Sequence, residues 1–132
     1  MKTVVHVDGG ARGNPGPAAI GAVVTTPEGE LLDEASALIG EATNNVAEYR
    51  ALLLGLERAR ALGATEVEIV NDSELVARQV GGTYKVKQAH LKPLHGEVVT
   101  ALRDFERWNI RSVPREENTR ADALVNEALD AT

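Results

Sequence analysis

The order of strand-like and helix-like segments constrains the fold of this chain more than any other feature of its sequence. Three segments rich in β-branched and small residues come first, joined by turn-forming glycine and proline, and they span Thr3–Asp8, Ala19–Thr26 and Leu31–Ile39. Segments with a helical spacing of apolar residues follow, at Val46–Leu62, Ser73–Gly81, Leu91–Arg107 and Thr119–Leu129. Two more strand-like segments lie between these helices, at Glu66–Val70 and Trp108–Val113.

This order predicts an α/β fold with a mixed five-stranded sheet flanked by helices. The first three strands follow one another through turns and are expected to be antiparallel, whereas strands separated by a helix are expected to be parallel. Residues 9–17 contain four glycines and two prolines, which predict an irregular turn between the first two strands.

The composition excludes several classes of protein. A length of 132 residues corresponds to one domain, which we expect to span residues 1–132. No apolar run approaches the roughly 18 residues that a membrane-spanning helix needs, and no signal peptide is recognisable. The chain has no cysteine, which excludes disulfides and thiolate metal ligands and fits a reducing cytoplasm. We therefore expect a cytoplasmic, monomeric protein with no membrane partner.

The charge of the chain is unevenly distributed. A net charge of −6 argues against a protein that holds nucleic acid by bulk electrostatics. Residues 75–96, however, contain no acidic residue and four basic ones, which are Arg78, Lys85, Lys87 and Lys92. This basic stretch is suited to a polyanion, although a solvated surface segment would have the same composition.

Four carboxylates stand where the predicted fold can bring them together. Asp8 ends the first strand and Asp72 follows the fourth, so two parallel neighbouring strands would place both at one edge of the sheet. Glu48 and Asp122 lie in the first turns of two predicted helices, where a carboxylate also stabilises the helix dipole. Crowded carboxylates are best relieved by a cation, and oxygen ligands favour Mg²⁺ or Mn²⁺. Spacing alone leaves both explanations open.

Four motifs occur in order along the chain: DGGARGNPG at residues 8–16, TNNVAEY at residues 43–49, NDS at residues 71–73 and ENTRAD at residues 117–122. With these motifs and the elements between them, the chain resembles a type 1 ribonuclease H (ribonuclease HI) of the archaeal-like or actinobacterial-like branch. The resemblance covers essentially the whole chain. It implies the ribonuclease H-like fold and a metal-dependent endoribonuclease that cuts the RNA strand of an RNA–DNA hybrid, leaving 5′-phosphate and 3′-hydroxyl ends.

The resemblance also implies roles for individual residues. The catalytic metal ligands would be Asp8, Glu48, Asp72 and Asp122, which would hold two Mg²⁺ ions, with Mn²⁺ as a substitute. The residues expected to contact the hybrid are Gly9, Gly10, Arg12, Asn14, Thr43, Asn44, Asn45, Ser73, Tyr84, Lys85 and Lys87. Arg115 stands in the loop where many relatives have a mobile histidine, and we expect it to support catalysis electrostatically.

Two other functions are compatible with many of these features. A non-catalytic hybrid-binding module would have the same fold, but it would gain nothing from four carboxylates beside phosphates. A related nuclease could act on another duplex, such as double-stranded RNA or a DNA junction. The amides Asn14, Asn44 and Asn45 favour the hybrid because they belong to the ribonuclease H pattern. Whether double-stranded RNA is a second substrate stays open at this point.

Overall fold

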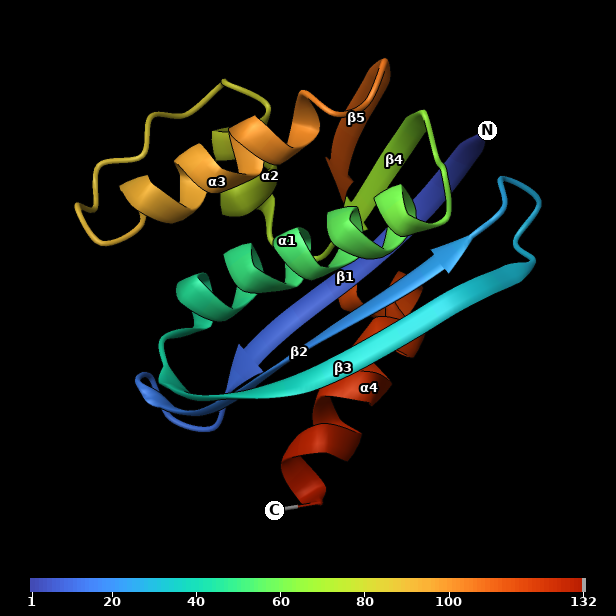
Figure 1. Cartoon of the computed structure of the whole chain (residues 1–132). Helices are drawn as coiled ribbons and strands as arrows, with labels where there is room; N and C mark the ends of the chain where they lie inside the picture. The colour runs from blue at the N-terminus through green and yellow to red at the C-terminus, as the bar shows by residue number, and fades with distance from the viewer. Residues whose placement is uncertain (132) are drawn as a thin grey trace.

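Five strands form one mixed sheet in the computed structural model, which describes residues 1–131 of the chain (Figure 1). The strands are β1 (Lys2–Ala11), β2 (Gly16–Thr25), β3 (Leu31–Ala42), β4 (Glu66–Asn71) and β5 (Arg107–Ser112). Their order across the sheet is β3-β2-β1-β4-β5. The pairs β1–β2 and β2–β3 are antiparallel, whereas β1–β4 and β4–β5 are parallel. The predicted α/β fold is confirmed; the predicted domain, residues 1–132, includes one residue outside the described part.

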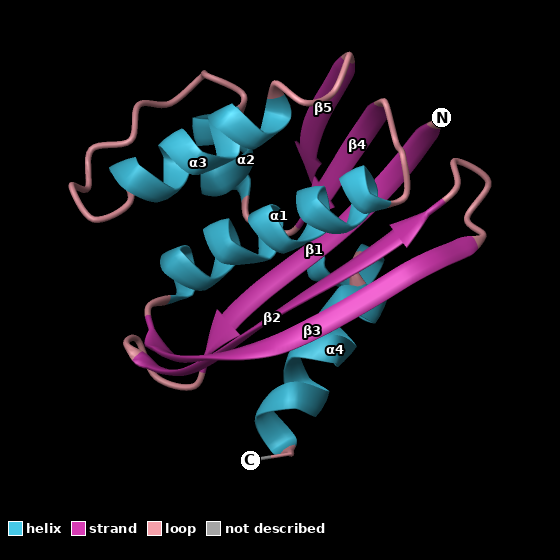
Figure 2. Cartoon of the chain, in the orientation of Figure 1, coloured by secondary structure: helices cyan, strands magenta, loops and turns pink. Residues whose placement is uncertain are grey.

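Helices cover both faces of this sheet (Figure 2). They are α1 (Asn44–Ala61), α2 (Glu74–Val80), α3 (Lys92–Leu102), the 3₁₀ turn η1 (Arg115–Glu117) and α4 (Thr119–Asp130). α1 packs on β1 and β2, with α2 and α3 on the same side, whereas α4 packs on the other face against β1, β2 and β3. Within the described residues, no helix combines the length and the apolar character needed to cross a membrane.

Alternation along the central strands divides their buried side chains between the two faces. Val5 and Val7 of β1 point toward α1, and a side chain at Gly55 of α1 would collide with both. Val23 of β2 packs on the other face against Leu124 of α4. Full burial of a large aliphatic side chain stabilises a fold by about 1.5–3 kcal/mol. Packing on both faces therefore makes the sheet a firm support for the strand ends.

The first two strands run further than the sequence predicts. The sequence predicts an irregular turn over residues 9–17, but β1 continues to Ala11 and β2 already begins at Gly16. The hydrogen-bond ladder between the two strands offsets the conformational cost of glycine within a strand. The turn is confined to the residues between them, where Gly13 has a φ of 103°. The glycines that follow Asp8 are therefore held in regular structure.

α3 is shorter than predicted, ending at Leu102 instead of Arg107. The following residues form turns in which the amide of Phe105 donates to the carbonyl of Leu102 at 3.2 Å. Phe105 is buried, and the amide of Glu106 donates to the carbonyl of Thr65 at 2.7 Å, which aligns the start of β5 with β4. The spacing of apolar residues places Phe105 on the buried face of a longer helix. It does not show that the helix has already ended and that Phe105 reaches the core from a turn.

Candidate metal centre and active site

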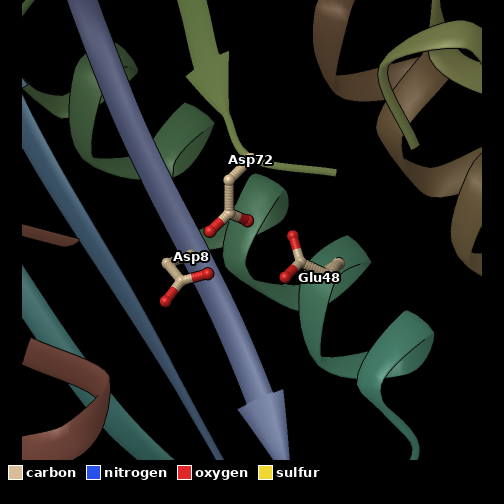
Figure 3. Close-up of side chains that lie close together, drawn as sticks. All are labelled: Asp8, Glu48 and Asp72. Atoms are coloured by element: carbon tan, nitrogen blue, oxygen red, sulfur yellow. The ribbon is translucent and has the colours of Figure 1, made fainter. Parts of the chain in front are cut away.

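Three carboxylates from different elements meet at one edge of the sheet (Figure 3). Asp8 lies in β1, and Asp72 directly follows β4. These strands are parallel neighbours with His6 opposite Val70, so the two aspartates reach the same level along the sheet. Glu48 joins them from α1, and one carboxylate oxygen of each residue lies within 4.8 Å of the others. The fold thus brings together three acids that are far apart in the sequence.

Glu48 does not lie in the first turn of its helix, where the sequence analysis places it. α1 begins at Asn44, because the hydroxyl of Thr43 accepts a hydrogen bond from the amide of Val46 at 3.3 Å and caps the helix. The helix dipole acts mainly over the first turn, so stabilisation of the helix does not account for a carboxylate at this position. Stabilisation of the helix dipole, the structural explanation that the sequence offers for Glu48, therefore does not apply to this residue.

Gly9 lets α1 approach β1 closely enough for this arrangement. A Cβ atom at Gly9 would overlap the backbone carbonyl of Ala47, the residue before Glu48. Any other residue at this position would push the start of α1 away from the sheet. The glycine that follows Asp8 therefore controls how near Glu48 comes to it.

The fourth predicted ligand, Asp122, reaches the site from the opposite face of the sheet. It lies in the first turn of α4, and its negative charge acts on Asp8. It is not one of the three residues whose oxygens lie within 4.8 Å of one another. All four carboxylates nevertheless line one open cavity of about 580 Å³.

The negative charges of this cluster oppose one another strongly. Burial, followed by the charges of Asp72 and Asp122, raises the pKa of Asp8 from 3.8 to about 8. Burial, followed by the charges of Asp8 and Asp72, also raises the pKa of Glu48. Asp8 and Glu48 are only 5% and 8% exposed, so water screens their repulsion poorly.

Two buried oxygens of the cluster lack a hydrogen-bond partner among the described residues, Oε2 of Glu48 and Oδ2 of Asp72. Buried polar atoms are normally paired, so buried oxygens without a hydrogen bond fit a bound cation, even though Oδ2 of Asp72 also has an ion pair with Arg115 at 3.6 Å. Asp8, Glu48 and Asp72 would hold such a cation, and Asp122 lies near enough to Asp8 to take part. A ligand set made only of oxygen suits Mg²⁺ or Mn²⁺.

Arg115 brings a positive charge to the edge of the cluster. Its Nε lies 3.6 Å from Oδ2 of Asp72, and its side chain is 77% exposed beside the cavity. The guanidinium partly offsets the rise in the pKa of Asp8. Because a guanidinium does not lose its proton in proteins, Arg115 can act on a phosphate only through its charge and its N–H donors.

The residues predicted to contact substrate fall into two groups. The first group lines the acidic cavity and consists of Gly9, Gly10, Arg12, Asn44, Asn45 and Ser73. Arg12 is held at the rim by a 2.5 Å hydrogen bond from Nη2 to Oδ1 of Asp130. Asn14 and Thr43 stand outside the lining and support it: Oδ1 of Asn14 accepts from the amide of Asn44 at 3.1 Å.

The second group lines a separate cavity of about 500 Å³ beside α2. Tyr84, Lys85 and Lys87 belong to residues 81–91, which connect α2 to α3 and are called the basic segment below. Tyr84 is 48% exposed, and the guanidinium of Arg78 lies over its ring, 5.3 Å from the centroid. The ring therefore packs against α2 and is still accessible to a ligand.

Sequence reasoning overlooks Asn126. This exposed residue lines the acidic cavity, and its Nδ2 donates to both Oδ2 and the carbonyl of Asp122, at 3.3 and 3.2 Å. The spacing of four residues on one helix is the signal that would have found it. Asn118 is the N-cap residue of α4 but makes no capping side-chain bond; its buried side chain donates to the carbonyl of Val7 at 2.9 Å and ties α4 to β1.

A mixed five-stranded sheet that gathers carboxylates from β1, β4 and α1 at one edge defines the class of ribonuclease H-like domains. Residues 6–128 match a family model described as reverse transcriptase-like. The chain is 50% identical over 132 residues to a bifunctional protein of Mycobacterium tuberculosis, a match that covers 99% of this chain and 36% of the relative.

Two solved structures are similar over nearly their whole length. Ribonuclease H1 from the halophilic archaeon Halobacterium salinarum is 42% identical with a TM-score of 0.97, and the match covers 100% of both chains. LC11 ribonuclease H1, solved in complex with an RNA/DNA hybrid, is 47% identical with a TM-score of 0.93, covering 98% of this chain and 97% of that one.

The chain belongs to the ribonuclease H1 family. Its similarity to an archaeal and a mycobacterial protein agrees with the branch that the motifs indicate. The chain spans 36% of the length of the mycobacterial relatives that it matches.

Proposed function

We propose that this chain is an endoribonuclease that hydrolyses the RNA strand of RNA–DNA hybrids and leaves 5′-phosphate and 3′-hydroxyl ends. The observation that carries the proposal is the cluster of Asp8, Glu48 and Asp72, with orphaned buried oxygens, beside an open cavity lined by glycine and amide groups. Membership of the ribonuclease H1 family and the similarity to LC11 ribonuclease H1, solved with an RNA/DNA hybrid, support the same substrate.

The cofactor in this proposal is a pair of Mg²⁺ ions, for which Mn²⁺ substitutes. When bound, such ions lower the pKa of a water molecule and neutralise charge on the scissile phosphate and the leaving oxygen. Asp8, Glu48, Asp72 and Asp122 hold them, and without a cation these acids repel a phosphate. Binding of metal and substrate at this site is therefore mutually favourable. Arg115 adds a permanent positive charge beside Asp72, where it attracts the phosphate that is being cut.

Selection of RNA rests on groups that border the acidic cavity. In this proposal the carboxylate of Glu48 also accepts a hydrogen bond from the ribose 2′-hydroxyl next to the scissile phosphate, a contact that DNA cannot make. Asn44 and Asn45 offer both donors and acceptors from the start of α1 to the minor groove of the hybrid. Gly9 and Gly10 leave room for the RNA backbone to approach the acids, since neither carries a side chain.

The DNA strand is held by basic and aromatic groups outside the acidic cavity. Lys85 and Lys87 contact phosphates, and the accessible ring of Tyr84 packs against the sugar–phosphate chain. Arg12, in the β1–β2 turn at the rim of the acidic cavity, and Thr43, which precedes α1, also contribute to phosphate binding. This division explains how a chain of net charge −6 binds a polyanion, because the contacts are local.

A cleavage assay tests the proposal. A short end-labelled RNA–DNA hybrid is incubated with Mg²⁺, Mn²⁺ or EDTA, beside matched RNA–RNA and DNA–DNA duplexes of the same sequence. We expect metal-dependent cutting of the RNA strand of the hybrid and no cutting of DNA–DNA. Absence of cutting in every lane, with hybrid binding intact, would make the chain a non-catalytic binding module.

The RNA–RNA duplex measures the breadth of the activity. Both strands of that duplex carry 2′-hydroxyl groups, so Glu48 alone does not exclude it, and the A-form shape of its minor groove is close to that of the hybrid. Cutting of RNA–RNA would extend the substrate class to double-stranded RNA, and its absence would place the discrimination in contacts to the DNA strand. We further propose that the domain acts as a monomer in the cytoplasm.

A further inference from the structure

A buried polar pair joins the helix that carries Glu48 to the short helix α2. The hydroxyl of Tyr49 donates to Oε1 of Gln79 at 2.6 Å, and the two residues are 0% and 6% exposed. A tyrosine hydroxyl carries one proton that it can donate, and here it donates that proton to the amide oxygen of Gln79. Burying a glutamine side chain costs free energy unless its polar atoms form hydrogen bonds, so a glutamine in the core suggests a specific role for the hydrogen bond that it makes.

Gln79 lies in the last turn of α2, and this turn anchors the basic segment. The amides of Thr83 and Tyr84 both donate to the carbonyl of Arg78, at 2.9 and 3.1 Å. The amide of Gly82 donates to the carbonyl of Gln79 at 3.3 Å. The same turn of α2 also contacts the basic segment through a side chain, since the guanidinium of Arg78 lies over the ring of Tyr84.

The carbonyl of Gln79 is also the contact point for α3, on the other side of the basic segment. Nε2 of His95 lies 3.1 Å from this oxygen, and the ring of His95 meets the ring of Tyr49 edge to face, with centroids 6.3 Å apart. Gln79 therefore contacts α1 through its side chain. Through its backbone carbonyl it contacts Gly82, at the start of the basic segment, and His95 of α3, which follows the segment.

Most of the basic segment is exposed. Val86 packs partly against the core, and Leu91 at its end is fully buried. The part that carries Tyr84 and Lys85, by contrast, is exposed and is joined to α2 by the bonds to Arg78.

Tyr49 directly follows Glu48 in α1. Consecutive residues of a helix point about 100° apart, so one turn of α1 presents Glu48 to the acidic cluster and Tyr49 to Gln79. A shift of α1 that moved Glu48 would move the support of α2 as well. The acidic cluster and the basic segment are thus connected by one helix turn and one side-chain hydrogen bond.

We propose that Gln79 is a positioning residue that fixes the basic segment relative to the acidic cluster, so that both strands of a bound hybrid meet their contacts at once. This inference rests on the proposed function. Gln79 touches no reacting atom; it acts through Lys85 and Lys87, which lie in the same cavity. The hydrogen bond to Tyr49 depends on the angle between donor and acceptor, so it fixes the rotation of α2 about its own axis. An apolar contact at the same place would hold α2 against α1 without fixing that rotation.

The test uses Gln79→Leu, Tyr49→Phe and the double variant, with the wild-type chain. We expect each single variant to melt at a lower temperature, because each leaves one buried polar group unsatisfied. We expect KM for the hybrid to rise about three- to tenfold with kcat unchanged, and the salt dependence of binding to become flatter, because phosphate contacts are lost. The double variant should recover melting temperature but not KM, since neither polar group remains and the directional bond is still absent.

A matched control separates positioning from plain loss of stability. Val67→Ala truncates a buried residue at the far end of β4 from Asp72, and it should lower the melting temperature without changing KM. Recovery of both melting temperature and KM in the double variant would overturn the inference, as would a raised KM in Val67→Ala. Hybrid affinity in EDTA gives the same comparison without catalysis. If the wild-type chain does not cut, the proposed function fails, and the affinities still decide whether Gln79 positions the basic segment.

Discussion

Replacement of Asp8 by asparagine keeps the shape of the side chain and removes one negative charge from the centre of the acidic cluster. We expect Asp8→Asn to abolish metal-dependent cleavage, because a metal ligand is lost. Binding of the hybrid in EDTA should be retained, since the contacts made by glycines, amides and lysines are untouched and one charge that repels phosphates has gone.

The same substitution should stabilise the metal-free protein at high pH. The pKa of Asp8 rises from 3.8 to about 8 on folding, so the folded state binds this proton more tightly than the unfolded chain does. The contribution of Asp8 to stability is therefore fully present below about pH 4 and is lost as the pH rises toward about 8. Between about pH 5 and pH 8 the loss has a ceiling of about 4 kcal/mol. Relaxation around buried charges reduces it, and we expect about 2 kcal/mol.

Thermal unfolding in EDTA measures this effect. For a domain of this size, about 2 kcal/mol corresponds to a difference in Tm of roughly 6 to 10 °C between Asp8→Asn and the wild-type chain. We expect that difference to be largest near pH 8 and to shrink toward pH 5. Added Mg²⁺ should raise the Tm of the wild-type chain more than that of the variant. Retained cleavage by Asp8→Asn, or a difference in Tm that does not change with pH, would refute the reasoning.

Substitutions at three further places test other parts of the site. Replacing Lys85 and Lys87 by alanine should weaken hybrid binding and reduce the slope of log affinity against log salt by about 2, and an unchanged slope would make the basic segment a solvated surface. Gly9→Ala should lower cleavage at least about tenfold because it displaces α1, whereas Gly10→Ala, which meets nothing closer than 3.8 Å, should melt like the wild-type chain. Arg115→Lys should keep more activity than Arg115→Ala if charge is what matters, which single-turnover rates would show; equal rates would remove the electrostatic role.

The fold could be predicted from the sequence wherever hydrophobic period and turn chemistry agree. The strand around Val5 and the helix around Leu52 are examples: Val5 and Val7 are both buried, and so are Leu52, Leu56 and Ala59, which recur at helical spacing. The meeting of Asp8 and Asp72 also follows from general rules, because Asp72 follows β4 and Asp8 lies at the same level in β1, its parallel neighbour. At these positions the secondary structure that the local sequence favours is also the one that tertiary packing stabilises.

Other features depend on contacts that no local pattern records. The continuation of β1 to Ala11 is decided by its ladder with β2, which overrides the poor strand propensity of glycine. The bond between Tyr49 and Gln79 could not be predicted, because helix spacing marks Tyr49 only as an inward-facing residue and says nothing of its partner. The contact between Asn126 and Asp122 could be predicted, because residues four apart on a helix lie on the same face. Its relation to the site becomes apparent only when the cavity is known.

The four carboxylates lie at positions 8, 48, 72 and 122, and the last of them stands on α4, across the sheet from α1. Only a fragment that includes residues 8–122 therefore contains the complete acidic set. During synthesis, the first three acids leave the ribosome well before the fourth, and the buried bond from Asn118 to Val7 can form only when α4 docks. We expect a nascent chain to be unable to cleave RNA until that moment, so that cleavage activity reports the docking of α4.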